Sequence, residues 1–415
     1  MNGNTGLSRR LFLRACAGWG ALGLSAVALE ACGGAPASGS AGSPAAKPAI
    51  ASPAGTSGTG AGSPAPSAGA AGPASGQAGS ASVQAASPAS AQPAASGLRK
   101  VSYGELRILG DAGVYVGMEQ GFFAKQGIDI QLVGFDTGVN MIPPLGTGQL
   151  DVGGGATSAG LLNAINRGVA LKAVADKGHI SPTPPGFPVA DLLVRKDLWD
   201  SGKVRSAKDL KGLTIATPAK GFSGELTAAK ELAKGGLKPT DVNFVNVPLT
   251  EIATAFANKK IDAGGAIEPF RTIIVDVQKT GVTLMHDYDV ESDGQTAVIL
   301  YGPSFAQSPL AVPFITAYLQ GVRMYNDGFV KKDPAARQKA IDAMIKHTAV
   351  KDRSLYDKMT IQGLDPNGKI NVASLQEQQD YWLAHGEQQK KVDLSSVIDD
   401  QFVKAAVAEL GTYAL

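Results

Sequence analysis

The feature that most constrains this chain is a 65-residue stretch, 33–97, built almost entirely from four small residue types. Ala, Gly, Ser and Pro occupy 57 of its positions, Lys47 is its only charge, and it has no aromatic residue. Such a composition buries too little apolar surface to offset the entropy lost on ordering the chain. We therefore predict a disordered linker over 33–97 and place the folded part of the protein in the 318 residues from 98 to 415.

The predicted folded part is close to neutral. The first 97 residues hold four basic side chains and one acidic side chain, which leaves 34 Lys and Arg against 35 Asp and Glu in the rest. The isoelectric point of about 8.3 therefore reflects mainly the start of the chain. Nucleic-acid-binding domains normally carry a strongly basic surface, so the composition disfavours nucleic acid as a partner.

Cysteine and histidine usage limits the chemistry of the folded part. Both cysteines, Cys16 and Cys32, precede the linker. The region 98–415 therefore has no disulfide, no thiolate zinc site and no cysteine nucleophile. The four histidines are scattered, with no pair spaced four residues apart. We expect no metal site and no cofactor.

Residues 1–32 have the pattern of an export signal. A basic start with Arg9, Arg10 and Arg14 precedes an apolar run over 15–29, which is too short to span a bilayer comfortably but suits a signal-peptide core. The segment S-R-R-L-F-L-R at 8–14 resembles a twin-arginine export motif. The segment L-E-A-C at 29–32 resembles a bacterial lipobox, which implies a diacylglyceryl group on Cys32 and a mature chain that begins there. A plain secretory signal is the alternative.

Lipidation of Cys32 would turn the linker into a membrane tether. A flexible chain of 65 residues has a root-mean-square span of roughly 45 Å, which the prolines would lengthen. We therefore expect an extracytoplasmic domain anchored to the bacterial cell membrane.

From residue 105 onward, short apolar runs alternate with amphipathic segments, as expected for βα units on a mostly parallel sheet. Strands are predicted at 106–109, 128–133, 150–152, 169–174 and 192–195, and helices at 114–125, 140–147 and 159–167. The same order recurs after residue 210, with strands at 213–216, 242–247 and 261–263 and helices at 224–234 and 249–258.

A short internal repeat favours two similar lobes. The segments Q-L-D-V-G-G at 149–154 and K-I-D-A-G-G at 260–265 occupy matching places in the two halves, and we expect their aspartates, Asp151 and Asp262, to hold turns or helix ends. We assign 98–195 to lobe 1, 196–290 to lobe 2 and 291–415 to a return into lobe 1. The return holds a strand at 297–301 and helices at 313–328, 334–348, 354–360, 372–385 and 401–410. The strands at 192–195 and 297–301 are expected to join the lobes.

Two α/β lobes predict a ligand-binding cleft. Ligands of such sheets bind beyond the carboxyl ends of strands, where helix N-termini offer free N–H groups. The candidate ligand-binding residues at these positions are Asp111, Tyr115, Thr137, Thr157 and Ser158 in the first half, and Lys220, Phe222, Ser223, Glu268 and Phe270 in the second. The segment 220–223 combines a cation, a glycine and a hydroxyl, so we interpret it as an anion cradle.

Several of these residues have an ordinary structural alternative. For Tyr115 and Phe270 it is core packing, and for Thr157 and Ser158 it is helix capping. Glu268 also suits a favourable charge position at a helix N-terminus, and Lys220 suits a solvated loop. His179 follows a predicted strand and is either a cleft residue or a structural one.

Several motifs together carry a family resemblance. They are Y-V-G-M-E-Q-G-F-F at 115–123, Q-G-I-D-I at 126–130, the stretches 146–158 and 166–175, A-K-D-L-K-G at 207–212, and Glu268-Pro269. Over roughly 104–330 the chain resembles the solute-binding proteins that serve ABC importers of sulfonates, nitrate, taurine and thiamine-precursor pyrimidines. The resemblance implies a two-lobed, hinged, periplasmic-binding-protein-like fold of type II without enzymatic activity, with an ABC permease and its ATPase as partners.

Two other classes remain open. Some proteins of this fold are enzymes of pyrimidine or cofactor biosynthesis, and others are ligand-binding sensor modules of signalling receptors. The export signal and the lack of a nucleophile–base pair favour transport over an enzyme. We expect the ligand to be a small organic molecule, such as a sulfonate or a pyrimidine precursor, because three aromatic candidates give more stacking surface than a bare nitrate needs.

Overall fold

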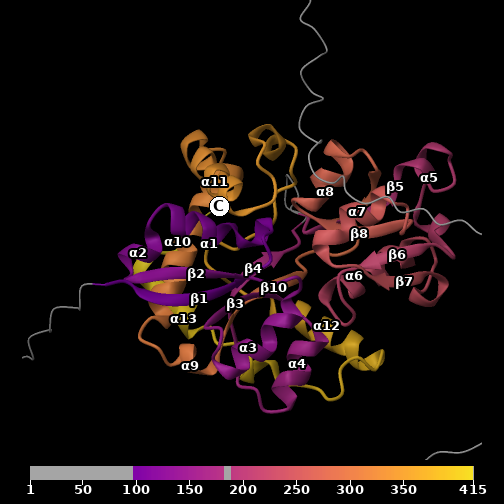
Figure 1. Ribbon diagram of the computed structural model, residues 1–415. Coiled ribbons are helices and arrows are strands. Elements are labelled where there is room, and N and C mark those ends of the chain that lie inside the picture. Colours follow the sequence, from indigo (N-terminus) through magenta and orange to yellow (C-terminus); the bar gives the residue numbers. More distant parts are fainter. Residues whose placement is uncertain (1–96, 182–187, 415) are drawn as a thin grey trace, which may run out of the picture. The chain divides into compact units, whose positions relative to one another are not determined.

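The structure is a computed structural model that describes residues 97–181 and 188–414 (Figure 1). The predicted export signal, the lipidation site Cys32 and the predicted linker up to residue 96 lie outside the described residues.

Five strands form the first sheet, in the order β2-β1-β3-β10-β4. They are β1 (Arg99–Glu105), β2 (Ile128–Gly134), β3 (Val152–Ala156), β4 (Lys172–His179) and β10 (Gln295–Tyr301). Strand β1 runs parallel to β2 and β3, whereas β10 runs antiparallel to β3 and β4. The connecting helices are α1 (Ala112–Glu119), α2 (Phe122–Lys125), α3 (Ile142–Thr147) and α4 (Ala159–Asn166).

The second sheet repeats this arrangement in the order β7-β6-β8-β5-β9. Its strands are β5 (Ala190–Arg195), β6 (Thr214–Thr217), β7 (Asn243–Asn246), β8 (Ala263–Ile267) and β9 (Gly281–His286). Strand β6 is parallel to β7 and β8, and β5 is antiparallel to β8 and β9. Its helices are α5 (Lys196–Asp200), α6 (Ser223–Lys234), α7 (Ile252–Ala257) and α8 (Phe270–Thr272). The prediction of two similar α/β lobes is confirmed.

The repeated aspartates perform the same task in both lobes. The Asp151 carboxylate accepts hydrogen bonds from the backbone N–H and the hydroxyl of Ser102 in β1, both at 2.8 Å. The Asp262 carboxylate accepts one from the backbone N–H of Thr214, which begins β6, at 3.0 Å. Both residues therefore fix the first parallel strand of their sheet, a structural role that differs from the turns or helix ends expected for them.

The predicted lobe boundary at residue 195 is wrong. Strand β5 pairs with β8 and β9, so it belongs to the second sheet, and the chain first crosses between the lobes after His179 and before Ala190. It crosses back between β9 and β10. The segments 192–195 and 297–301 thus lie inside the sheets and do not connect them. An apolar run such as that of β5 identifies a buried strand but not the sheet that the strand joins.

Four other elements differ from the prediction. The first strand is β1 and not 106–109, because residues 106–109 leave the sheet and enter a 3-10 turn at Leu109–Asp111. The predicted helix 114–125 is split into α1 and α2 at Gly121, whose φ of 70° ends the first of them. The predicted helix 354–360 is a 3-10 turn at Arg353–Asp357. Strand β9, absent from the prediction, has mostly half-buried side chains and therefore a weak apolar pattern.

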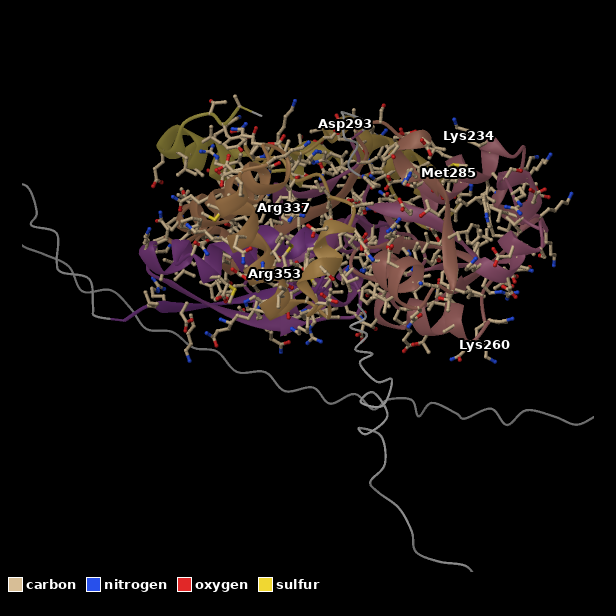
Figure 2. All side chains as sticks on the ribbon, turned by 90° about the horizontal axis from the view of Figure 1, so that it is seen from above. Lys234, Lys260, Met285, Asp293, Arg337 and Arg353 are labelled. Atoms are coloured by element: carbon tan, nitrogen blue, oxygen red, sulfur yellow. The ribbon has the colours of Figure 1, made fainter. Side chains whose placement is uncertain are left out.

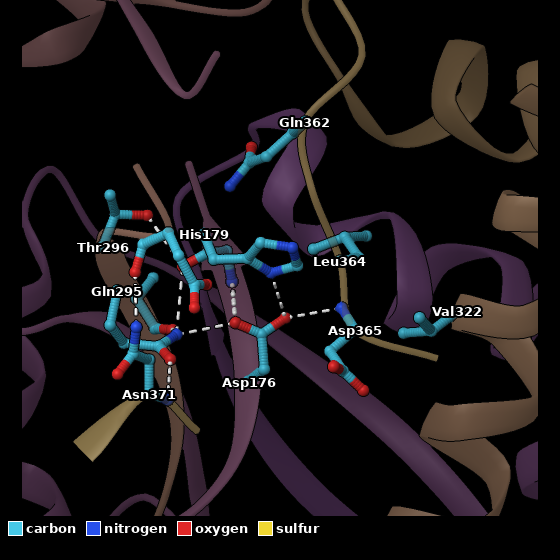
Figure 3. A network of polar contacts seen from close by, with 12 residues as sticks. Asp176, His179, Gln295, Thr296, Val322, Gln362, Leu364, Asp365 and Asn371 are labelled. Carbon is cyan, nitrogen blue, oxygen red and sulfur yellow. Dashed lines mark hydrogen bonds and ion pairs between the residues drawn. The ribbon is translucent and has the colours of Figure 1, made fainter. Parts of the chain in front are cut away.

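A polar network holds the two crossing points together (Figure 3). The Asp176 carboxylate near the end of β4 accepts hydrogen bonds from the Gln295 side chain of β10 at 2.6 Å and from the backbone N–H of Asp365 at 2.7 Å. It also lies 3.3 Å from Nδ1 of His179. Burial lowers the pKa of His179. The carboxylates of Asp176, Asp365 and Asp293 outweigh this effect and raise the pKa above its ordinary value. His179 is therefore part of this junction.

The C-terminal segment adds helices that pack mainly on the first lobe, as predicted. These are α9 (Pro303–Ala306), α10 (Ala311–Phe329), α11 (Pro334–His347), α12 (Val372–Ala384) and α13 (Gln401–Leu410). Helix α10 packs against α1, α11 and α13 (Figure 1). Helix α12 also reaches the second lobe, where Lys230 of α6 bonds Glu377 of α12 at 2.9 Å. None of the described helices combines the length and apolarity needed to cross a bilayer.

Buried apolar side chains form three clusters. One fills the space between the first sheet and helices α1, α10, α11 and α13, and another lies on the outer side of the second sheet. A third cluster continues from the first lobe, through Leu106 and Leu300, to Leu193 and Phe256 of the second. The lobes therefore share part of one core. Charged side chains such as Lys234 and Lys260 are exposed on the second lobe (Figure 2).

A fully buried ion pair lies beneath the first sheet. Lys177 of β4 lies 3.0 Å from Asp111, and the Tyr103 hydroxyl donates to the same carboxylate at 2.9 Å. The second oxygen of Asp111 accepts from the backbone N–H of Leu106. A Cβ at Gly154 of β3 would overlap both the Tyr103 hydroxyl and the Lys177 side chain. The glycine is thus required by the ion pair.

We predict that Gly154→Ala destabilises the protein by about 1–3 kcal/mol, because the added methyl group overpacks this site. The control is Gly265→Ala at the matching position of β8, where a Cβ would have no neighbour within 4 Å. That change should alter the free energy of unfolding by no more than about 0.5 kcal/mol. Urea unfolding of both variants measures the difference, and equal midpoints would contradict the prediction.

Candidate functional site

An enclosed cavity lies where strands of both sheets end. It has a volume of about 110 Å³, enough for several water molecules or part of a small organic molecule. Residues of both lobes line it, including Leu106, Ile108, Thr137, Ala156 and Thr296 from the first, Ile215, Thr217, Phe222, Ser223, Thr227, Glu231, Gly265, Ile267 and Asp287 from the second, and Gln362 from the C-terminal segment. Ligands of α/β sheets bind at such strand ends.

Most of the cavity wall is apolar. Leu106 and Ile108 follow β1, Ile215 lies in β6, and Ile267 ends β8. The Phe222 ring precedes α6 and lies so close to Gly224 that a side chain at position 224 would strike it. Such a wall favours a ligand with an apolar or aromatic body.

Two buried carboxyl groups stand at one part of the cavity. Asp287, 1% exposed, accepts hydrogen bonds with one oxygen from the backbone N–H groups of Val189 and Ala190, at 2.9 and 2.8 Å. Its other oxygen has no hydrogen-bond partner in the part of the chain that the structure describes. Glu231 of α6 is 4% exposed, and no hydrogen bond or ion pair joins its carboxyl to another described residue.

Burial and neighbouring charges act on both carboxyls. Burial, together with the nearby Asp287, Asp191 and Glu291, raises the pKa of Glu231 well above its ordinary value. Burial likewise raises the pKa of Asp287 to about 7, against the opposing effect of its backbone hydrogen bonds. Each group is therefore costly to ionise while the cavity is empty.

The nearby cations are already paired. Asp191 is bonded by His286 at 2.7 Å and by Arg271 at 3.3 Å. The hydrogen bond to Asp191 raises the pKa of His286, and the partial burial of His286, which lowers the pKa, is the smaller effect. Lys230 lies 3.6 Å from Glu291, and the Thr227 hydroxyl donates to Glu291 at 2.9 Å.

The loops that follow β3 and β6 form a clasp between the lobes. The backbone N–H of Ala159 donates to the carbonyl of Gly221 at 2.7 Å, and that of Ser223 donates to the carbonyl of Thr157 at 3.1 Å. Ser158 and Phe222 pair as an isolated antiparallel bridge. We define this set of contacts, 157–159 with 221–223, as the clasp. It closes one side of the cavity.

The polar groups of the predicted anion cradle and of the facing loop are mostly bonded within the protein. The N–H of Ser223 is bonded across the clasp, and the Ser158 hydroxyl caps α4 by accepting from the N–H of Leu161 at 3.1 Å. The Thr157 hydroxyl donates to Gln378 at 2.6 Å. Lys220 faces a separate surface hollow with Glu225 and Glu387. In the described structure these groups do not converge on the cavity.

Of the ten candidate residues, Thr137, Phe222 and Ser223 line the cavity. The side chains of two others are used elsewhere in the first lobe. Asp111 forms the ion pair with Lys177. The Tyr115 hydroxyl donates to Glu105 at 2.6 Å, and its ring stacks on His347 at 4.8 Å between centroids. Both side chains are buried in the core of the first lobe.

The last two candidates belong to the second lobe. Glu268 accepts hydrogen bonds from the backbone N–H groups of Thr272, at 3.1 Å, and Thr360, at 3.0 Å. Burial raises its pKa even though these bonds oppose the shift. Phe270 is 6% exposed and packs in the shared apolar cluster. Neither residue is among those that line the cavity.

Sequence reasoning missed Glu231 and Asp287. It examined only residues next to strand ends, whereas Glu231 lies in the third turn of α6. A signal was available, because Glu231 shares the buried face of this helix with Leu226 and Thr227. A carboxylate on such a face is rare without a partner. Asp287 follows β9, the strand that was not predicted.

The chain is similar in sequence to one protein family and to a named binding protein. The family model "NMT1/THI5 like" matches residues 110–327. A Bacillus subtilis (strain 168) protein named for the binding of aliphatic sulfonates is 26% identical over 298 residues, which cover 69% of this chain and 81% of that protein.

Two solved structures show how the fold is used elsewhere. The alkanesulfonate-binding protein SsuA from Xanthomonas axonopodis pv. citri, bound to MOPS, superposes with a TM-score of 0.58 at 19% identity, covering 74% of this chain and all of that one. The desulfurization enzyme DSZB superposes with a TM-score of 0.54 at 12% identity, over 75% of this chain and 99% of that one. With the family model matching more than half of its length, the chain belongs to the NMT1/THI5-like family.

Proposed function

We propose that this protein is an extracytoplasmic solute-binding lipoprotein that captures a small organic molecule for an ABC importer. The observation that carries the proposal is the cavity enclosed by strand ends of both lobes. The named binding proteins among its relatives and structural neighbours support the same function.

Capture requires that the lobes separate to admit the ligand. The clasp consists of backbone hydrogen bonds between two loops, so opening it leaves both sheets intact while part of the shared apolar cluster separates. The junction around Asp176 and Gln295 lies where the chain crosses between the sheets and would remain bonded. We propose a hinge at this junction and closure at the clasp, as in other two-lobed binding proteins.

The side chains that line the cavity include no nucleophile paired with a base among the described residues. No His, Cys, Lys or Arg is among the described residues that line it. The Ser223 hydroxyl donates to the carbonyl of Thr296 at 3.3 Å and not to a base. An activated nucleophile needs a neighbouring base or a lowered pKa. We therefore propose binding without chemistry, although the fold also occurs in an enzyme.

We predict that Gly265→Leu abolishes ligand capture. Gly265 lines the cavity and a Cβ there meets no atom within 4 Å, so the larger side chain fills the ligand's space without disturbing the strand. Full-length protein would be incubated with a bacterial metabolite extract, desalted and heat-denatured, and the released compounds identified by mass spectrometry. Wild type and the control Gly265→Ala should release a compound that Gly265→Leu does not.

The same experiment can contradict the proposal in two ways. Release of the same compounds from Gly265→Leu would place the binding site elsewhere. A wild-type protein that retains no compound from extracts of several growth conditions would count against solute capture itself.

We also predict that Cys32 carries the lipid anchor and that the linker joins it to the domain. Cys32→Ser should move the protein from the membrane fraction to the soluble fraction, because stable anchoring needs the acyl chains. Cys16→Ser is the matched control, since Cys16 lies within the predicted signal core and should not affect partitioning. Equal membrane association of all three proteins would refute lipidation.

A further inference from the structure

We propose that the ligand carries a cationic nitrogen, an ammonium or an amidinium, on an apolar body, and that Glu231 and Asp287 bind this nitrogen. The inference rests on the proposed solute-binding function and specifies its substrate class. It departs from the sulfonates that the named relatives bind.

First, the carboxyl groups of Glu231 and Asp287 are buried without a full set of hydrogen-bond partners among the described residues. Asp287 is held by two backbone N–H groups through one oxygen, and its other oxygen is buried and unpartnered among the described residues. Glu231 is equally buried and also lacks a partner there. Buried polar groups in folded proteins are nearly always hydrogen-bonded. A donor supplied by the ligand would complete both groups.

The second argument is that the hydroxyls around the cavity act as acceptors toward it. Thr217 donates its proton to Asn246 at 3.4 Å, and Thr227 donates to Glu291 at 2.9 Å. Ser223 donates to the carbonyl of Thr296, whose own hydroxyl donates to the carbonyl of Gly178 at 2.9 Å. Each of the four hydroxyls therefore offers only lone pairs to a ligand.

Few donors remain for an anion. Among the described lining side chains, Thr137 and Gln362 are the ones whose donors are not bonded within the protein. The N–H of Ser223, at the start of α6, is bonded across the clasp. A sulfonate presents three acceptor oxygens and would find mostly other acceptors among these side chains.

The third argument is the local charge. Asp191, Asp289 and Glu291 surround the two carboxyls, and the cations on this side are His286, Arg271 and Lys230. His286 and Arg271 bond Asp191, and Lys230 is shared between Glu291 and Glu377. These cations offset the surrounding carboxylates, so a ligand cation would be attracted by Glu231 and Asp287, whose ionised form it favours, whereas an anion would disfavour that form and be repelled by it.

The apolar wall defines the rest of the ligand. Leu106, Ile108, Ile215 and Ile267 surround the space, and the Phe222 ring can stack on a flat group. A bare inorganic cation would leave this wall solvated, so the charge must sit on an organic body.

The test uses three probes that share one body. They are 2-phenylethylamine, 2-phenylethanol and 2-phenylethanesulfonate, added to the full-length protein and followed by calorimetry and thermal unfolding. We expect the amine to bind at least tenfold more tightly than the alcohol, and the sulfonate to bind more weakly still. A protonated carboxyl could donate to an anion, and the sulfonate probe detects that case.

Variants assign the effect to the two carboxyls. Glu231→Gln and Asp287→Asn should each weaken binding of the amine about ten- to a hundredfold, because each removes a charge-assisted hydrogen bond. Glu251→Gln, an exposed carboxylate of the same lobe, is the control and should leave the affinity unchanged. If Asp287→Asn does not fold, Glu231→Gln alone decides.

Three results would overturn the inference. They are tighter binding of the sulfonate or the alcohol than of the amine, no binding of the amine, and an affinity for the amine that Glu231→Gln does not change. A compound released from the wild type in the extract experiment would still support solute capture in each case. Failure of that experiment would overturn both proposals.

Discussion

Each sheet in this protein is completed by a strand that reaches it from the other lobe. In the first sheet, β10 lies between β3 and β4, and β4 has no other strand partner in the sheet. In the second, β5 lies between β8 and β9 in the same way. Because unpaired strand edges expose free N–H and C=O groups, the first sheet is complete only after the chain has crossed to the second lobe and returned.

This double crossing determines where a ligand can bind. Both crossings are gathered at the Asp176 junction, and the lobes also meet through loops and through a shared apolar cluster. The parallel strands β1, β3, β6 and β8 direct their carboxyl ends to the region between the lobes, and the cavity lies there. Topology therefore fixes the position of the site before any side chain is considered.

Buried carboxyl groups in this protein fall into two kinds. Asp111 has a lysine, a tyrosine hydroxyl and backbone N–H groups as partners, and Asp176 has a comparable set. Removing one partner from such a buried pair costs about 3–5 kcal/mol, which identifies these residues as structural. Glu231 and Asp287 are buried to the same extent without a full set of partners among the described residues. Burial keeps their pKa raised, and the proposed ligand would supply the donors that they lack.

Sequence reasoning reached the architecture but only part of the site. The matching D-V-G-G and D-A-G-G segments predicted two lobes because Asp151 and Asp262 perform one task in both. The expectation that ligands bind beyond strand ends correctly identified Phe222 and Ser223 as cavity residues, because their positions depend only on the local course of the chain after a strand. It failed for Tyr115 and Glu268, since a residue next to a strand end can turn toward the cleft or toward a helix. Only the packing of α1 and of the segment around Thr360 decides between these directions.

The anion cradle shows most clearly why family resemblance sets the fold and not the ligand. The segment 220–223 has the composition of an anion site. A sulfonate, after which one relative is named, would be a suitable anion for it. In this chain the same backbone groups bond the opposite lobe, and the cation Lys220 lies with Glu225 and Glu387 outside the cavity. With the N–H of Ser223 used for closure, most polar side chains that remain in the cavity are acceptors. The chemistry of recognition therefore passes from the strand-end loops to the third turn of α6, where a single buried glutamate can reverse the charge of the ligand on an unchanged fold.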